Sequence, residues 1–162
     1  MPDTIPLERL LPCLLDRLTD EEPEQEKESR DRRVVSLRRY IDGVRRDLGW
    51  LLNSKARLPG DDIYQYHEAT RSVLNYGIPD LCGMTPSSVK PEEFERHLRQ
   101  ALMVFEPRLD RGGLLVRVVA DTEQMTGNAV SFEINGELFA QPAPESFYVK
   151  TEVDLETGQW KF

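Results

Sequence analysis

The sequence predicts an α+β fold in which N-terminal helices pack on a small antiparallel sheet of about four C-terminal strands. Two observations carry this prediction. Up to Phe105, apolar residues recur mainly at steps of three and four, the period of an amphipathic helix. Beyond Gly112-Gly113 the period changes to two and β-branched residues accumulate, which is typical of strands. Helices that precede strands in the chain favour the α+β class.

The charge pattern predicts three parts in the 162 residues. Residues 1–18 form an N-terminal helical extension, residues 19–33 a charged linker, and residues 34–162 a single α+β domain. The linker carries seven acids and four bases and no aliphatic or aromatic side chain. Such a segment cannot bury enough surface to offset the entropy lost on ordering.

The N-terminal extension contains an apolar stripe that suits a short helix from Pro12 to Leu18. Its leucines are Leu11, Leu14, Leu15 and Leu18. On a flexible tether this helix could dock on a partner, or it could fold back onto its own domain; the sequence leaves both alternatives open.

Three further helices are predicted. The most regular runs from Val34 to Leu52, where Gly43 and Gly49 indicate that another group approaches the backbone closely. A shorter helix covers residues 63–74 and is stopped by Gly77. The last opens with a proline at residue 91, where the missing amide costs nothing, and ends before Pro107.

The predicted strands follow. Residues 114–120 are apolar on both faces except at Arg117, which indicates a strand that is interior or covered by helices. Asn135-Gly136 is a common hairpin turn, but a turn there would place Ile134 opposite Glu137. A continuous strand instead keeps the apolar residues on one face. Residues 141–144 then reverse the chain, residues 147–155 alternate strictly, and a hairpin at residues 156–158 returns the last strand.

Composition excludes several classes of function. The net charge of −8 argues against binding nucleic acid. Two cysteines without ligand spacing, and two histidines outside any metal motif, predict no metal, no cofactor and a reducing, cytoplasmic location. No apolar run is long enough for membrane insertion. No nucleophile, phosphate-binding or dinucleotide motif occurs, so we predict that the chain is not an enzyme.

Glu106, Pro107 and Arg108 form a fixed corner between the last helix and the sheet. Proline biases Glu106 away from the α region, and the planar fork of Arg108 suits the carbonyls or carboxylates of another chain. Beside Arg108, the pKa of Glu106 should fall, the wrong direction for a general acid. We therefore predict a docking element, in which Arg108→Ala impairs assembly and leaves the melting temperature nearly unchanged.

The predicted sheet should also leave an open edge, whose unpaired backbone groups would accept a strand of another chain. The alternative is an edge blunted by Lys150, Glu152 and nearby prolines. Composition does not decide between them.

Six segments are shared, in order, with a known family: residues 11–18 (LPCLLDRL), 46–53 (RDLGWLLN), 72–77 (SVLNYG), 105–108 (FEPR), 132–138 (FEINGEL) and 150–155 (KTEVDL). They span nearly the whole chain. They resemble the TssE family of bacterial type VI secretion systems, which is similar to the gene-twenty-five baseplate wedge proteins of contractile-tailed phages. Cys13 departs from the family's usual serine, and Gly49 from a commoner larger residue.

The resemblance implies a structural wedge subunit of a cytoplasmic baseplate near the inner membrane. Its implied partners are TssF, TssG and TssK and, through strand addition that helps to start the contractile sheath, TssB and TssC. The candidate partner-binding residues are Glu106, Pro107, Arg108, Arg46, Asp47, Trp50, Asn75, Tyr76, Lys150 and Glu152. Because related phage proteins have been labelled lysozymes, a peptidoglycan-cleaving enzyme is the rival interpretation. A small anti-adaptor-like regulatory protein is a third.

Overall fold

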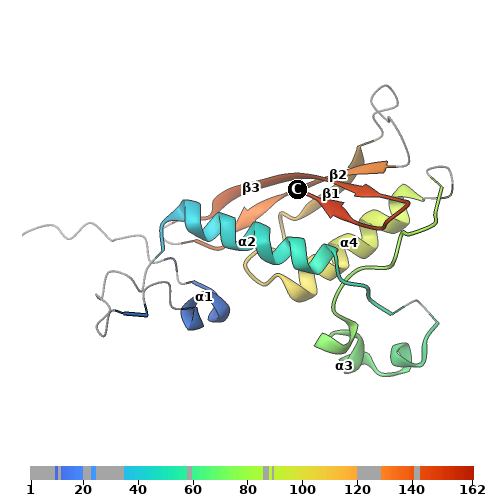
Figure 1. The fold of residues 1–162 in the computed structure, drawn as a ribbon, viewed down its shortest axis with the longest axis horizontal. Helices are drawn as coiled ribbons and strands as arrows, with labels where there is room; N and C mark the ends of the chain where they lie inside the picture. Colours follow the sequence, from blue (N-terminus) through green and yellow to red (C-terminus); the bar gives the residue numbers. More distant parts are fainter. Residues whose placement is uncertain are drawn as a thin grey trace, which may run out of the picture.

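The computed structural model describes residues 10, 12–19, 23–24, 35–57, 60–85, 88, 90–119, 129–140 and 143–162. It confirms the α+β class: helices come first, and a four-stranded antiparallel sheet with the order β1-β2-β3-β4 comes last (Figure 1). Most of the predicted linker lies outside the described residues, so its flexibility and the division of the chain into three parts stay predictions.

Helix α2 (Leu37–Leu52) supplies much of the core. The prediction began it at Val34, which lies outside the described residues, but Ser36 is extended and its hydroxyl accepts a hydrogen bond from the Arg39 amide at 3.3 Å. This cap explains why the helix begins at Leu37. Its buried face consists of Tyr40, Val44, Leu48, Leu51 and Leu52.

Two glycines of α2 confirm the predicted close approaches. A Cβ atom at Gly43 would lie 3.5 Å from a carboxylate oxygen of Asp16, and one at Gly49 would lie 3.7 Å from the ring of Phe162. The N-terminal helix α1 (Leu14–Leu18) and the C-terminal end of the chain therefore both lie against α2.

The segment after α2 differs from the prediction. The single helix predicted over residues 63–74 is wrong: the chain forms the 3-10 turn η2 (Asp62–Gln65), the short helix α3 (His67–Thr70) and the 3-10 turn η3 (Val73–Asn75). Tyr66 is extended, with φ −116° and ψ 97°, which interrupts the helix. The segment projects away from the sheet (Figure 1), so it has no packed face to stabilise a continuous helix.

Helix α4 (Pro91–Phe105) agrees with the prediction. Pro91 stands in its first turn, followed by two acidic residues that favour the positive end of the helix. Glu106 ends the helix with φ −118° and ψ 81°, outside the α region as Pro107 requires.

The sheet consists of β1 (Leu115–Val119), β2 (Ala129–Leu138), β3 (Glu145–Asp154) and β4 (Trp160–Lys161). Asn135 and Gly136 lie inside β2, paired with Tyr148 and Phe147, so the continuous strand is confirmed. Burial alternates along β2 and β3. One face of the sheet therefore packs against the helices, and the other carries polar side chains.

Strand β1 corrects one alternative of the prediction. Among the described residues it pairs with β2 alone and lies at the edge of the sheet, so it is not an interior strand. The other alternative holds, because α4 contacts β1 and Val116 is buried. The apolar character of β1 reflects cover by a helix.

Candidate docking site

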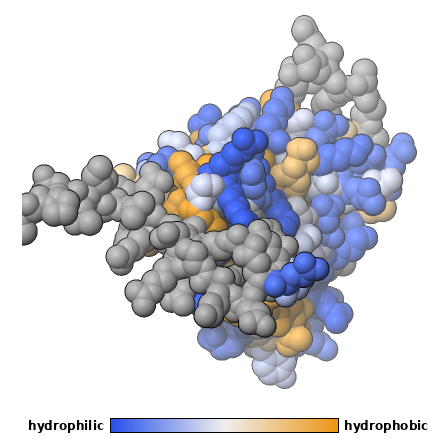
Figure 2. Space-filling view, turned by 60° about the vertical axis from the view of Figure 1, so that its left-hand side comes forward, coloured by the Kyte–Doolittle hydropathy of each residue, from blue (hydrophilic) through white to orange (hydrophobic). Residues whose placement is uncertain are grey.

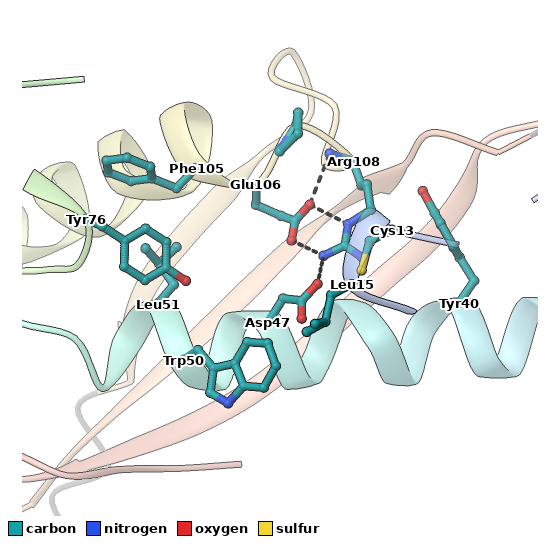
Figure 3. Close-up of a pocket in the computed structure, with 11 residues that line it drawn as sticks. Cys13, Leu15, Tyr40, Asp47, Trp50, Leu51, Tyr76, Phe105, Glu106 and Arg108 are labelled. Carbon is teal, nitrogen blue, oxygen red and sulfur yellow. Dashed lines mark hydrogen bonds and ion pairs between the residues drawn. The ribbon is translucent and has the colours of Figure 1, made fainter. Parts of the chain in front are cut away.

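The corner between α4 and the sheet is built around one ion-pair cluster (Figure 3). The Arg108 guanidinium donates from Nε to Glu106 Oε1 at 2.7 Å and from one terminal nitrogen to Asp47 Oδ2 at 2.6 Å. The Arg108 amide also donates to Glu106 Oε1 at 3.1 Å. Glu106 is only 4% exposed. Much of the Arg108 fork is therefore used inside the chain, where it compensates a buried carboxylate.

A second arginine extends this cluster to α1. Arg46 donates to Asp47 Oδ1 at 2.9 Å and pairs with Asp16 of α1 at 2.5 Å. Its guanidinium carbon also lies 4.9 Å from the ring centroid of Trp50. A continuous chain of opposite charges thus joins α1, α2 and the corner.

A hollow of about 480 Å³ lies beside this cluster. Four aromatic residues line it: Tyr40, Trp50, Tyr76 and Phe105. The corner residues, Leu15 of α1 and Cys13, which precedes α1, complete the lining together with Asp47 and Leu51. The Tyr76 and Phe105 rings meet edge to face, with centroids 5.2 Å apart. The arrangement combines apolar walls with a few fixed charges, which is typical of a recognition pocket.

The charges of the cluster shift the pKa values of their neighbours. Burial opposes the charged form of Arg108, but Glu106 and then Asp47 outweigh it and raise the pKa of Arg108. Burial, with the carboxylates of Asp47 and Glu106, raises the pKa of Tyr76. Arg108 therefore stays charged, and Tyr76 neutral, at neutral pH.

The position of α1 should depend on pH. The hydrogen bond from Arg46 lowers the pKa of Asp16 below 3.8, so the ion pair stabilises the contact of α1 with α2 above that pH and is lost as pH falls through the lowered pKa. We expect the Gly43 amide resonance, next to Asp16, to move on acidification. In Asp16→Asn that resonance should already hold its acidic position at neutral pH. A Gly43 resonance that Asp16→Asn leaves unmoved would contradict this expectation.

Side chains of α4 and of Asn53, which follows α2, bind backbone groups along two stretches of the sheet edge. At β1, Arg99 donates to the Leu114 carbonyl at 3.0 Å, and Glu95 accepts from the Val118 amide at 2.7 Å. At β4, the Asn53 side chain accepts from the Trp160 amide at 2.9 Å and donates to its carbonyl at 3.3 Å. These contacts occupy some of the backbone groups that an added strand would need, whereas the outward amide and carbonyl of Val116 have no hydrogen-bond partner among the described residues.

The remaining stretch of edge, along β3, is open among the described residues. Strand β4 pairs only with Glu152 and Val153, so β3 has a neighbour on one side only from Glu145 to Thr151. Backbone groups alternate in direction along a strand. The Asp154 amide donates to the Gln159 carbonyl at 3.0 Å, toward β4. The backbone groups of every second residue before it point the same way: Ser146, Tyr148, Lys150 and Glu152. The first three therefore direct amides and carbonyls outward without a strand to receive them.

The predicted site residues fall into three places. The pocket and its charge cluster unite most of them: Arg46, Asp47, Trp50, Tyr76, Glu106, Pro107 and Arg108. Asn75 is buried and holds the local chain, accepting from the Arg57 amide and donating to the Thr70 carbonyl. Lys150 and Glu152 lie on the exposed face of β3, where with Lys161 and Phe162 they line a second, smaller hollow. Whether these residues bind partners stays a prediction.

Helix α1 contacts its own domain, yet its leucines are exposed. Asp16 pairs with Arg46, while Leu14, Leu15 and Leu18 are exposed by 68%, 46% and 74%. Leu11 lies outside the described residues. The chain thus holds α1 with its apolar side chains available to a partner.

Sequence reasoning missed several residues of this region. Asp16, Tyr40 and Asn53 were not nominated, although each makes a contact that shapes the pocket or closes an edge. No local pattern marks these roles, because the partners lie from 30 to 107 residues away in the chain.

A comparison with protein families decides the class of the chain. The model described as baseplate wedge protein gp25 matches residues 38–143, about two thirds of the sequence. The chain belongs to this family. No curated protein matches the sequence. Family membership makes the chain a structural component of a phage-tail-like baseplate, and the resemblance noted from the six segments is confirmed at this level.

The wedge family is compatible with the absence of an enzymatic role, which stays a prediction. Glu106 gives the lysozyme-like alternative little support, because it is buried and Arg108 binds both of its oxygens. Such a carboxylate is not placed to protonate a glycosidic oxygen. Among the described residues, no cluster of metal-ligating side chains occurs, and no helix is long and apolar enough to cross a membrane.

Proposed function

We propose that this wedge-family chain is the TssE-type subunit of a type VI secretion baseplate in the cytoplasm near the inner membrane. It binds the baseplate proteins TssF, TssG and TssK through the pocket, the corner at Glu106-Pro107-Arg108 and helix α1. It also helps to start the contractile sheath of TssB and TssC by accepting a strand. The proposal rests on family membership and on the six shared segments.

The observation that carries the strand-accepting role is the open edge of β3. The stretch from Glu145 to Thr151 is long enough for a short added strand, and Ser146, Tyr148 and Lys150 direct amides and carbonyls toward it. The contrast with β1 and β4 supports a functional edge, because side chains from α4 and from Asn53 bind outward backbone groups of those two strands, and none of the described side chains does so between Glu145 and Thr151. In the alternative interpretation Lys150, Glu152 and the nearby prolines would blunt the edge; of the two charged residues, Lys150 lies on the stretch without a β4 neighbour.

Tyr148→Pro tests this role. Proline removes the outward amide of residue 148 and leaves the hydrogen bonds between β2 and β3, so the domain should stay folded. The pyrrolidine ring also obstructs an added strand. We expect sheath formation by TssB and TssC on a baseplate containing the variant to fall by about tenfold or more, measured by co-sedimentation.

The matched control is Tyr148→Ala, which removes the same side chain, including its hydrogen bond to Glu133, and keeps the amide. It should retain most of the sheath binding. Equal binding by wild type and Tyr148→Pro would reject strand addition at β3. A pull-down of TssF, TssG and TssK with the wild-type chain tests the wedge role separately, and capture of none of them would reject the type VI assignment.

A further inference from the structure

The open edge of β3 has a chemical preference that family membership does not specify. Residues directly opposite each other on neighbouring strands share one face of the sheet, so their side chains form rows across it. One row on the exposed face consists of Arg117, Glu133 and Lys150, from β1, β2 and β3. The charge alternates in sign from strand to strand, and the row ends on a positive residue at the open edge.

The charge at the end of this row is not compensated within the part of the chain that the structure describes. Lys150 is exposed on β3, and its ammonium group forms no ion pair with any described residue. Glu133, which lies opposite on β2, instead accepts a hydrogen bond from the Tyr148 hydroxyl at 3.0 Å. The ammonium group of Lys150 is therefore available to a carboxylate on a strand that joins the other side of β3.

Strand β4 shows which side chains suit the position beside β3. Lys161 of β4 lies opposite Glu152, so the sign of the charge alternates there too. Trp160 lies opposite Val153 on the other face and is buried in the core. Just beyond β4, a hollow of about 300 Å³ opens against β3, with Lys150 in its lining. An added strand that continued the course of β4 would enter this hollow.

The inner face of β3 requires apolar neighbours along the same stretch. Phe147 and Val149 are buried on that face, so a residue opposite either of them extends the core if its side chain is apolar. The face of the molecule in Figure 2 likewise presents apolar patches between hydrophilic side chains. The strand that fits the edge therefore alternates, with apolar residues toward the helices and polar residues on the exposed face.

We propose that the open edge of β3 selects a strand of a sheath subunit that carries an aspartate or glutamate opposite Lys150, with an apolar residue on each side of that acid. The acid continues the row of alternating charges. The two apolar residues face the helices, as Trp160 of β4 does. This inference rests on the proposed strand-accepting role and specifies the chemistry of the strand that is accepted.

The test is a titration of the full-length chain, labelled with ¹⁵N, against the acetylated and amidated pentapeptide Thr-Val-Glu-Val-Thr at low salt. Its sequence reads the same in both directions, so the result does not depend on strand direction. Two comparison peptides carry glutamine or lysine at the centre. We expect a saturable shift of the Tyr148 amide resonance. The glutamate peptide should bind about threefold more tightly than the glutamine peptide and about tenfold more tightly than the lysine peptide.

A pair of charge-reversal variants locates the preference. Lys150→Glu should reverse the order, so that the lysine peptide binds most tightly, because opposite charges attract across neighbouring strands and like charges repel. Lys90→Glu is the matched control: it changes the net charge by the same amount at an exposed residue that precedes α4. This variant should keep the order of the wild type.

Three results would overturn the inference: equal affinity for the three peptides, an order that Lys150→Glu leaves unchanged, or no saturable shift with any peptide. The sheath assay separates this inference from the proposed function. If Tyr148→Pro lowers binding of TssB and TssC and Lys150→Glu does not, strand addition stands and the preference for an acid is rejected. If the baseplate proteins and the sheath do not bind the chain at all, the proposed function fails, while the order of the peptides still measures the preference of the edge.

Discussion

Arg108→Ala should destabilise the chain by about 3–5 kcal/mol, because it leaves the Glu106 carboxylate buried without a compensating charge. Glu106 is 4% exposed, and Arg108 supplies hydrogen bonds to both of its oxygens and one to Asp47. Urea unfolding followed by tryptophan fluorescence measures the loss. The sequence alone predicts the opposite, a nearly unchanged melting temperature, because it assigns the Arg108 guanidinium to binding another chain.

The matched control for Arg108→Ala is Arg45→Ala on α2. The Arg45 side chain is 52% exposed and meets Asp42 at only 4.0 Å, so its removal should change the free energy of unfolding by less than about 1 kcal/mol. A further variant, Arg108→Met with Glu106→Leu, removes both buried charges and should recover part of the lost stability. If Arg108→Ala melted like wild type and still failed to bind baseplate proteins, the original docking interpretation would be restored.

Gly77→Ala should be comparably destabilising, by about 3–5 kcal/mol, because it combines backbone strain with overlap. Gly77 has φ +126°, and a Cβ atom there would lie 2.3 Å from the Ser54 carbonyl oxygen. That carbonyl accepts a hydrogen bond from the Ile78 amide at 3.0 Å. The substitution would therefore separate the chain after α2 from the segment that leads to α4.

Gly60→Ala separates the cost of backbone strain from the cost of steric overlap. Gly60 also has positive φ, +109°, but nothing lies within 4 Å of its Cβ position. Strain alone should cost about 1–3 kcal/mol. Comparable losses in the two variants, measured by the same unfolding experiment, would show that the contact with Ser54 is unimportant.

The sequence predicted the fold where one element's own pattern was decisive. The period of α2, the proline that opens α4 and the continuous strand through Asn135-Gly136 all agree with the structure. The prediction failed over residues 63–74, where helix formers occur but no neighbouring surface covers one face. Most helical stability comes from such packing, so the segment breaks into short turns.

The candidate site was predicted in part. Arg46, Asp47, Trp50, Tyr76 and the corner residues do meet in one pocket. Sequence spacing could not show that the donors of Arg108 bind Glu106 and Asp47, which is 61 residues away. It also could not show that Asn53 binds the backbone of β4, or that Glu95 and Arg99 bind backbone groups at β1.

The sequence by itself determined the order of helices and strands, the side of each strand that faces the core, and the wedge family. These properties follow from local period, backbone preference and shared segments. Only the tertiary structure decided that β3 keeps an open edge and that the Arg108 guanidinium binds Glu106 and Asp47 of its own chain. The physical reason is that a hydrogen-bonding group is free or satisfied according to what lies beside it in space, and those neighbours come from distant parts of the chain.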